Sequence, residues 1–267
     1  RDKGYRVVVF GKYDDELDGK ALKKPVTPLC YVFLSNAIRA GAENTFAYFA
    51  RCGVEIKVIS GDNPRTVSEI SIKAGIENAD KYIDASTLHS YDDIYEAIQE
   101  YTVFGRVTPE QKRLFVQALQ EQGRTVAMTG DGVNDVLALK DADCSVAMAS
   151  GSDAASNVAH IVLMDSDFSR MPSVVLEGRR VVNNIQRSAS LFLVKNIFSL
   201  LMALMAMIFV WQYPLEPSQI SLVGAFTIGI PSFFLALEPN KNRIRGHFLT
   251  NVFLKALPGG LTTFIVI

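Results

Sequence analysis

The sequence predicts an α/β fold with a parallel sheet, followed by transmembrane α-helices. Before about residue 188, short apolar runs alternate with amphipathic stretches, whereas beyond it charges become sparse and long apolar segments take over. Continuous apolar strands separated by helices are typical of a parallel sheet that is covered on both faces. We therefore expect a catalytic or binding domain at residues 1–168, a stalk helix at 169–188 and a membrane region at 189–267.

Each element of the first half has a local signal. Apolar runs rich in β-branched or aromatic residues predict strands, and helical periodicity behind a capping residue predicts helices. Asn63-Pro64 and Thr108-Pro109 both place proline at the favoured first turn of a helix. The predicted strands are 5–11, 28–34, 54–59, 103–104, 124–128, 144–148 and 161–163. The predicted helices are 40–51, 63–74, 108–121 and 136–140.

The net charge and the cysteine spacing limit the classes of function that the sequence supports. A net charge of −1 gives no reason to expect nucleic acid as a partner. Cys30, Cys52 and Cys144 are scattered and lack metal-ligand spacing, so we expect core thiols in a reducing compartment.

The strongest chemical signal is the segment Thr129-Gly-Asp-Gly-Val-Asn-Asp135, which follows a predicted strand and precedes a predicted helix. Glycines allow a sharp turn and a close approach to a ligand. Open α/β sheets bind ligands at the carboxyl ends of their strands. Asp131 and Asp135 offer the oxygens that Mg²⁺ prefers, and Mg²⁺ usually accompanies a phosphate. The alternative is a plain acidic turn.

Two more loops carry polar residues. Ser60-Gly61-Asp62 ends a strand and opens a helix, where backbone N–H groups attract phosphate, although this is also an ordinary turn and helix cap. Lys112 lies in the first turn of helix 108–121, which cations normally avoid. A bound anion explains its position, and so does simple solvation at the surface.

In this order along the chain, the loops resemble the haloacid dehalogenase superfamily, and within it the P-type ATPases, ion pumps that form an aspartyl-phosphate. The resemblance implies a Rossmann-like parallel sheet, ATP as substrate, Mg²⁺ as cofactor, and phosphoryl transfer by positioning and charge neutralisation. The pattern is most similar to a bacterial branch of cation pumps with few acids in these membrane helices. We therefore expect a multi-pass protein of the bacterial plasma membrane with a cytoplasmic catalytic domain.

The resemblance also implies residue roles. The Ser60 hydroxyl holds the transferred phosphoryl group, Lys112 neutralises it, and the Asn134 amide helps to hold the site. The implied catalytic residues are Ser60, Gly61, Asp62, Lys112, Asn134 and Asp135. The implied Mg²⁺ residues are Asp131, the direct ligand, and Asp135. Arg39 and Arg106 match arginines near the nucleotide and phosphates.

The sequence departs from the family pattern in two places. The string Asp-Lys-Thr-Gly-Thr, which holds the family's nucleophilic aspartate, does not occur. We therefore expect the chain to be the C-terminal part of a longer pump, inactive alone, with the missing N-terminal part as its partner. Asn36 occupies the place of an aspartate that is common before Arg39.

The second half has the length and composition of membrane spans. Residues 189–211 and 219–237 are long enough to cross a bilayer, and 253–267 begin a third span. Lys241, Arg243 and Arg245 follow the second span, and basic residues collect on the cytoplasmic side. Core helices of a soluble protein are the alternative.

The sequence of the membrane helices gives little indication of which ion is transported. Candidate transport residues are Lys195, Asn196, Thr227 and Pro231. Ile228 stands where the family's calcium and sodium pumps place an acid, so calcium is a candidate by resemblance alone. Lys195 either extends to the interface or acts as a built-in cation that pairs with a carboxylate or replaces a counter-transported ion. Pro231 frees backbone carbonyls, and such breaks line ion paths.

Two rival functions remain. A membrane-anchored phosphatase of the same superfamily needs its own nucleophilic aspartate, and the Asp residues before Ser60 lie in no suitable strand-end motif. A non-catalytic fragment would not be expected to keep Ser60, Lys112, Asp131 and Asp135 in order. The sequence therefore favours the pump.

Overall fold

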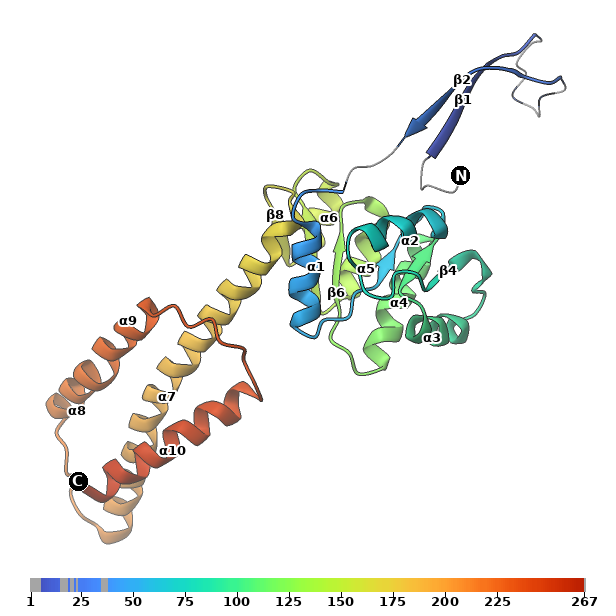
Figure 1. The fold of residues 1–267 in the computed structure, drawn as a ribbon. Helices are drawn as coiled ribbons and strands as arrows, with labels where there is room; N and C mark the ends of the chain where they lie inside the picture. The colour runs from blue at the N-terminus through green and yellow to red at the C-terminus, as the bar shows by residue number, and fades with distance from the viewer. Residues whose placement is uncertain (1–5, 15–18, 20–21, 23, 35–37, 267) are drawn as a thin grey trace. The chain divides into compact units, whose positions relative to one another are not determined.

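The structure is a computed structural model that describes residues 6–14, 19, 22, 24–34 and 38–266. The chain divides into two compact units, Arg1–Pro172 and Ser173–Ile267. The strands and short helices lie in the first unit, and the long apolar helices lie in the second (Figure 1).

The described part of the first unit contains two three-stranded parallel sheets. In one sheet β5 lies between β3 and β4, and in the other β7 lies between β6 and β8. The strands are β3 (Val58–Ile59), β4 (Tyr82–Asp84), β5 (Val103–Gly105), β6 (Ala127–Gly130), β7 (Cys144–Met148) and β8 (Ile161–Leu163). The parallel pairing confirms the predicted fold class, although two sheets replace the single sheet expected. β3 and β6 are both edge strands.

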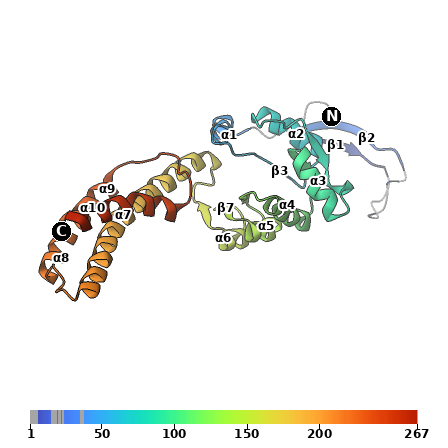
Figure 2. The ribbon, with the colours of Figure 1, turned by 90° about the horizontal axis from the view of Figure 1, so that it is seen from below.

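Helices cover these sheets, and one helix joins them. The helices of the first unit are α1 (Ala42–Arg51), α2 (Pro64–Lys73), α3 (Tyr91–Glu100), α4 (Pro109–Glu121), α5 (Val136–Asp141) and α6 (Asp153–Val158). On α4, Phe115 packs on Phe104 of β5 with ring centroids 4.6 Å apart, and the adjacent Val116 joins a core cluster with Val126 and Ala138. The helices α4, α5 and α6 lie together beside β7 (Figure 2).

The first two predicted strands form, but outside the parallel sheets. β1 (Arg6–Lys12) and β2 (Thr27–Leu34) pair antiparallel as a two-stranded sheet of their own. Parallel neighbours need a long crossover, usually a helix, and no helix was predicted between these two runs. Their inclusion among the strands of a parallel sheet was therefore wrong.

Other boundaries also differ from the prediction. The expected strand 54–59 is reduced to Val58–Ile59, and Val54 is exposed, so the run is not a buried strand throughout. The strand expected at 124–128 begins only at Ala127. The elements β4, α3 and α6 were not predicted.

The second unit is built on one long helix. α7 (Met171–Phe209) runs without interruption through the predicted stalk and first span. A second span follows as α8 (Pro217–Gly224), the π-helical segment η4 (Ala225–Gly229) and α9 (Ile230–Leu237). α10 (Phe248–Val266) begins before the expected residue 253 and contains Pro258. By length and composition, three helices of the described chain could cross a membrane.

Small residues allow these helices to approach one another. A methyl group added to Gly260 of α10 would lie 2.5 Å from a side-chain carbon of Ile197 on α7, and one added to Gly259 would lie 3.2 Å from Val194. α7 also contacts the second span, because Asn184 of α7 donates to the carbonyls of Ala236 and Glu238 at the end of α9. Close packing through small residues is typical of membrane helices. α7 therefore contacts both neighbouring spans.

Candidate functional site

The loop that follows β3 places a serine hydroxyl at the start of α2. Ser60 Oγ accepts a hydrogen bond from the Asp62 backbone N–H at 3.1 Å. Asn63 then caps α2, because its Oδ1 accepts from the Arg65 N–H at 3.1 Å. Backbone N–H groups at a helix start attract anions. Gly61 and its neighbours thus form a compact polar turn at the carboxyl end of a parallel strand.

This turn is held by the loop that follows β5. The Val107 N–H donates to the Ser60 carbonyl at 3.0 Å, and the Arg106 N–H donates to the Asp62 carbonyl at 2.8 Å. The two loops therefore contact each other backbone to backbone, and a displacement of one displaces the other.

The second loop leads directly to the predicted lysine. Thr108 and Gln111 form a capping box at the start of α4, which fixes its first turn. From that turn Lys112 Nζ lies 2.6 Å from Asp135 Oδ1, with only 14% and 9% of the two side chains exposed. A cation at a helix N-terminus is disfavoured by the helix dipole, and the carboxylate offsets that repulsion. Lys112 is thus anchored to the acidic loop.

The acidic loop folds around Asp135. Its second oxygen, Oδ2, accepts from the Gly132 N–H at 3.2 Å, so both carboxylate oxygens have partners inside the protein. A methyl group at Gly130 would lie 2.6 Å from the Asp135 Cβ, which explains the glycine. Asp131 and Asn134 are exposed on the same loop. The structure therefore links Ser60, Lys112 and Asp135 through successive contacts, as the order of the loops suggested.

Comparison with known proteins identifies the family. A family model described as haloacid dehalogenase-like hydrolase matches residues 8–143, just over half of the chain. The chain belongs to the haloacid dehalogenase-like hydrolases. It is 45% identical to the "Calcium-transporting ATPase CtpE" of Mycolicibacterium smegmatis, over 97% of this chain and 34% of that protein. It is 40% identical to the "Probable cation-transporting ATPase exp7" of Streptococcus pneumoniae, over 97% of this chain and 35% of that protein.

The chain spans about a third of the length of these curated relatives. A solved structure of the catalytic domain of the CPx-ATPase CopB-B aligns with 57% of this chain and 50% of that chain, at 26% identity and a TM-score of 0.41. With its three long apolar helices, this haloacid dehalogenase-like hydrolase is a multi-pass membrane protein.

The donor set of the hydrolase site suits Mg²⁺. The Asp131 carboxylate is exposed, and no hydrogen bond or ion pair engages it within the described residues. The same residues contain no group of three or more His, Cys, Asp or Glu side chains that could enclose a metal. Mg²⁺ is commonly held by one or two carboxylates together with water and substrate phosphates, so Asp131 fits. Direct coordination by Asp135, whose oxygens are both engaged, stays a prediction.

The two arginines expected near the nucleotide lie in different places. Arg106, with φ 55°, pairs through Nη1 with Asp84 Oδ2 at 2.7 Å. Hydrogen bonds from Ser86, followed by this arginine, lower the pKa of Asp84. Arg39 instead donates to the carbonyl of Ser166, after β8. The structure does not bring the two arginines together, and Asn36 lies outside the described residues.

One part of the site was not predicted. In the turn after β7, the Ser152 N–H donates to the Asp131 carbonyl at 2.7 Å. A methyl group at Gly151 would lie 2.4 Å from that same carbonyl oxygen. The signal was present, because Ser150-Gly151-Ser152 follows a predicted strand at the carboxyl end, where the other site loops also lie.

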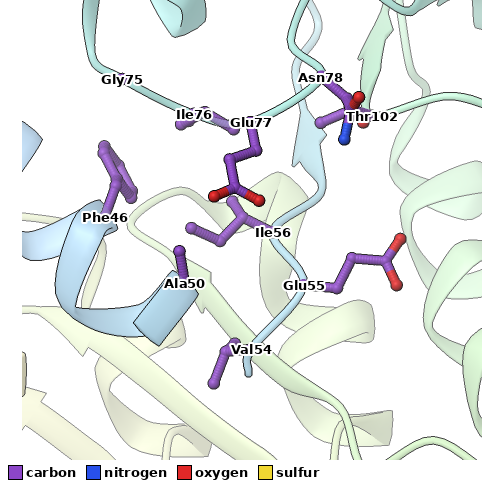
Figure 3. Close-up of a pocket in the computed structure, with 10 residues that line it drawn as sticks. All are labelled: Phe46, Ala50, Val54, Glu55, Ile56, Gly75, Ile76, Glu77, Asn78 and Thr102. Atoms are coloured by element: carbon purple, nitrogen blue, oxygen red, sulfur yellow. The ribbon is translucent and has the colours of Figure 1, made fainter. Parts of the chain in front are cut away.

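A separate pocket of about 130 Å³ lies elsewhere on the first unit (Figure 3). Phe46, Ile56 and Ile76 supply apolar walls, and the Glu77 side chain points among them. None of the predicted site residues that the structure describes lines it. The pocket is therefore distinct from the loops that carry Ser60, Lys112 and Asp135.

In the second unit, Lys195 reaches the interrupted span. A methyl group added to Gly224 would lie 3.2 Å from the Lys195 Nζ. Gly224 immediately precedes η4, where the Ile230 N–H bonds to the Ala225 carbonyl five residues back. Pro231 follows at the start of α9, so the break expected there is a π-helical turn. Widened turns of this kind often mark functional sites.

The other candidate transport residues are not gathered around Lys195. Asn196 and Thr227 are exposed, and the Thr227 hydroxyl donates to the Val223 carbonyl of its own helix. Ile228, which stands where an acid was expected, is 4% exposed.

Proposed function

We propose that the full polypeptide is a P-type ATPase that couples ATP hydrolysis, through an aspartyl-phosphate, to cation transport. The observation that carries the proposal is the contact chain from the Ser60 loop through α4 and Lys112 to Asp135. This phosphate-type site lies on a chain that continues through α7 into helices able to cross a membrane. The names of the two relatives, both cation-transporting ATPases, support it.

In this proposal each loop has a task at the phosphoryl group. The Ser60 hydroxyl and the N–H group of Gly61 donate to its oxygens, while the Asp62 N–H donates to Ser60 Oγ and holds that hydroxyl in place. Lys112 carries three N–H donors, so it donates to the phosphoryl group while keeping its bond to Asp135. The exposed Asn134 amide completes the cradle. Mg²⁺ held by Asp131 supplies neutralisation of the phosphoryl charge.

The remainder of the longer polypeptide supplies the nucleophilic aspartate and most of the ATP site. Arg106, with its guanidinium held by Asp84 beside the Ser60 loop, serves the nucleotide phosphates. The proposed location is the bacterial plasma membrane, with the catalytic domain on the cytoplasmic side, where Lys241, Arg243 and Arg245 also lie.

The transported species is a cation, with calcium as the candidate from the name of the 45% identical relative. Lys195 lies roughly 16 Å along α7 from Asn184, which marks the polar end of the second span. Its ammonium is directed at Gly224 beside η4 rather than at that end, which favours a built-in cation over extension to the interface. The proposed path runs beside Lys195 and the π-helical turn, where Pro231 follows at the start of α9, while ion contacts by the exposed Asn196 and Thr227 stay predictions.

The test uses the full-length protein in reconstituted vesicles. Acid-stable phosphoenzyme formed from labelled ATP is measured with Ca²⁺, Mn²⁺, K⁺ and proton gradients in turn. Stimulation by one ion names the cargo. Asp131→Asn should abolish phosphoenzyme, whereas Asp92→Asn, an exposed aspartate in the first turn of α3, should not change it.

Four results would contradict the assignment at different levels. Phosphorylation of Asp131→Asn at the wild-type rate would exclude the metal role. Phosphoenzyme without any ion response would exclude a cation as cargo. Phosphate release without a phosphoenzyme would favour a membrane-anchored phosphatase, and no activity at all would favour a non-catalytic protein.

A further inference from the structure

The turn after β7, residues 149–152, is held in place by hydrogen bonds from its backbone. Each of its four successive N–H groups donates a hydrogen bond, and the acceptors come from three separate segments of the first unit. The bonds are Ala149 to the Leu163 carbonyl (3.0 Å), Ser150 to Ser166 Oγ (2.8 Å), Gly151 to the Met148 carbonyl (2.9 Å) and Ser152 to the Asp131 carbonyl (2.7 Å). Because all four N–H groups of this turn are hydrogen-bonded, we expect the turn to move as a rigid unit. It connects the segment after β8 to the acidic loop.

At one end, this turn contacts the main chain of Asp131 closely. Besides the bond from Ser152, the Cα of Gly151 lies so close that an added methyl group would be 2.4 Å from the Asp131 carbonyl oxygen and 3.0 Å from its Cα. The Asp131 side chain itself is exposed and is engaged by no described residue. The turn therefore holds the main chain from which the Asp131 carboxylate extends, and it thereby fixes where that side chain starts.

At the other end, the turn is held by an arginine from a distant part of the sequence. Arg39 Nη1 donates to the Ser166 carbonyl, a bond strengthened by the guanidinium charge. Ser166 has φ 51°, a left-handed conformation that a non-glycine residue keeps only when its contacts hold it. Hydrogen bonds from Ser169 lower the pKa of the neighbouring Asp167, with smaller contributions from Arg170 and Arg39, so that side also carries a carboxylate facing Arg39.

We propose that Arg39 is a positioning residue for Asp131. Through Ser166 and the 149–152 turn it fixes the main chain of the acidic loop, and it thereby sets the affinity of the site for its divalent cation. This inference rests on the proposed function only in taking Asp131 as the cation ligand. Mg²⁺ demands near-ideal geometry, so a small displacement of its carboxylate lowers affinity. The segment that enters α1 is thus linked to the metal loop, a role different from a contact with the nucleotide.

The experiment measures Mn²⁺ binding by electron paramagnetic resonance on the full-length protein in detergent, without nucleotide or phosphate. Asp131→Asn defines the signal that belongs to this site. Arg39→Met should weaken Mn²⁺ binding about fivefold, at the low end of measured coupling between sites. Ser166→Ala, which removes the acceptor for the Ser150 N–H, should act in the same direction. Arg39→Lys, which keeps the charge and a donor, should fall between wild type and Arg39→Met.

Matched controls separate positioning from general damage. Arg51→Met removes an exposed arginine of α1 whose hydrogen bond, among the residues that the structure describes, goes to the Ala47 carbonyl of its own helix, and it should leave Mn²⁺ binding unchanged. Thermal unfolding of each variant verifies that the fold is kept. At saturating ATP, a higher Mg²⁺ concentration should restore the phosphorylation rate of Arg39→Met to the wild-type maximum.

The outcomes distinguish this inference from the proposed function. Unchanged Mn²⁺ affinity in Arg39→Met, or a rise only in its KM for ATP, would overturn the inference and leave the pump assignment intact. Absence of any Asp131-dependent Mn²⁺ binding in the wild type would overturn it as well. Mn²⁺ binding that responds to Arg39, in a protein that forms no phosphoenzyme, would support the inference while the proposed function fails.

Discussion

The Nζ of Lys112 lies 2.6 Å from Oδ1 of Asp135, and this ion pair joins the start of α4 to the acidic loop. The two residues come from separate elements, 23 positions apart in the sequence. Each side chain is largely withdrawn from water, so each charge depends on the other. The pair fixes the position of the Lys112 amine beside the acidic loop.

Removing one partner of this pair should destabilise the protein strongly. Lys112→Met leaves the Asp135 charge buried without its cation, and breaking such a pair typically costs about 3–5 kcal/mol. The double variant Lys112→Met/Asp135→Asn should recover much of that loss, because no buried charge remains. Thermal unfolding midpoints of the full-length protein in detergent measure both effects. Equal unfolding midpoints for the single and double variants would contradict the conclusion that each buried charge depends on the other.

Gly105→Ala should disrupt the contact between the Ser60 loop and the loop after β5. A methyl group there would lie 2.3 Å from the backbone of Pro64, so one of the two loops must shift. We expect lower stability together with slower phosphorylation. Gly178→Ala is the matched control, since nothing lies within 4 Å of its added methyl group. A Gly105→Ala protein with the wild-type unfolding midpoint and phosphorylation rate would show that the two loops can separate without loss of stability or activity.

Stability should fall in acid partly through Asp141. Arg113 Nε donates to its Oδ2 at 2.7 Å, and this hydrogen bond, more than any other interaction, lowers the pKa of Asp141. A lowered folded-state pKa gives stability that is fully present above the unfolded value and is lost as pH falls through the folded one. The difference in unfolding midpoint between wild type and Asp141→Asn should thus be constant near neutral pH and shrink below about pH 4. A constant difference down to pH 3 would exclude this contribution.

Lys195→Met and Gly224→Ala should alter ion dependence in the same direction. The first removes the ammonium beside η4, and the second adds a methyl group 3.2 Å from its present position, which displaces it. ATPase activity against ion concentration in vesicles is the measurement. Gly229→Ala is a control in the same π-helical segment, because the nearest atom to its added methyl group is 3.8 Å away. Unchanged transport in Lys195→Met would remove this lysine from the ion path.

The elements with strong local signals were predictable from sequence. Thr108-Pro109 with Gln111 specifies the start of α4, and the capping box forms as those residues dictate. Asn63-Pro64 does the same for α2. The resemblance of the polar loops to the haloacid dehalogenase pattern implied one site for Lys112 and the acidic loop, and the Lys112 Nζ lies 2.6 Å from Asp135 Oδ1 although the two loops follow strands of separate sheets.

Pairing and long-range contacts could not be predicted. Local propensity does not state which strand lies beside which, so the separation into two sheets and the antiparallel pairing of β1 with β2 were missed. The bond between Arg39 and Ser166 joins residues 127 positions apart, and nothing local to either residue encodes it. The π-helical turn was anticipated only as a break near Pro231, because proline marks the missing N–H but not how the chain absorbs it.

The 39 residues of α7 form a single rod about 58 Å long (Figure 1). After Pro172 in its first turn, no proline interrupts the helix before Lys195, and sharp kinks in helices rarely arise without such a cause. A rotation imposed near Met171 is therefore carried to the ammonium beside Gly224 as a rotation of similar size. Within α7, a turn of the first residues about the helix axis therefore also changes the direction in which the Lys195 side chain extends.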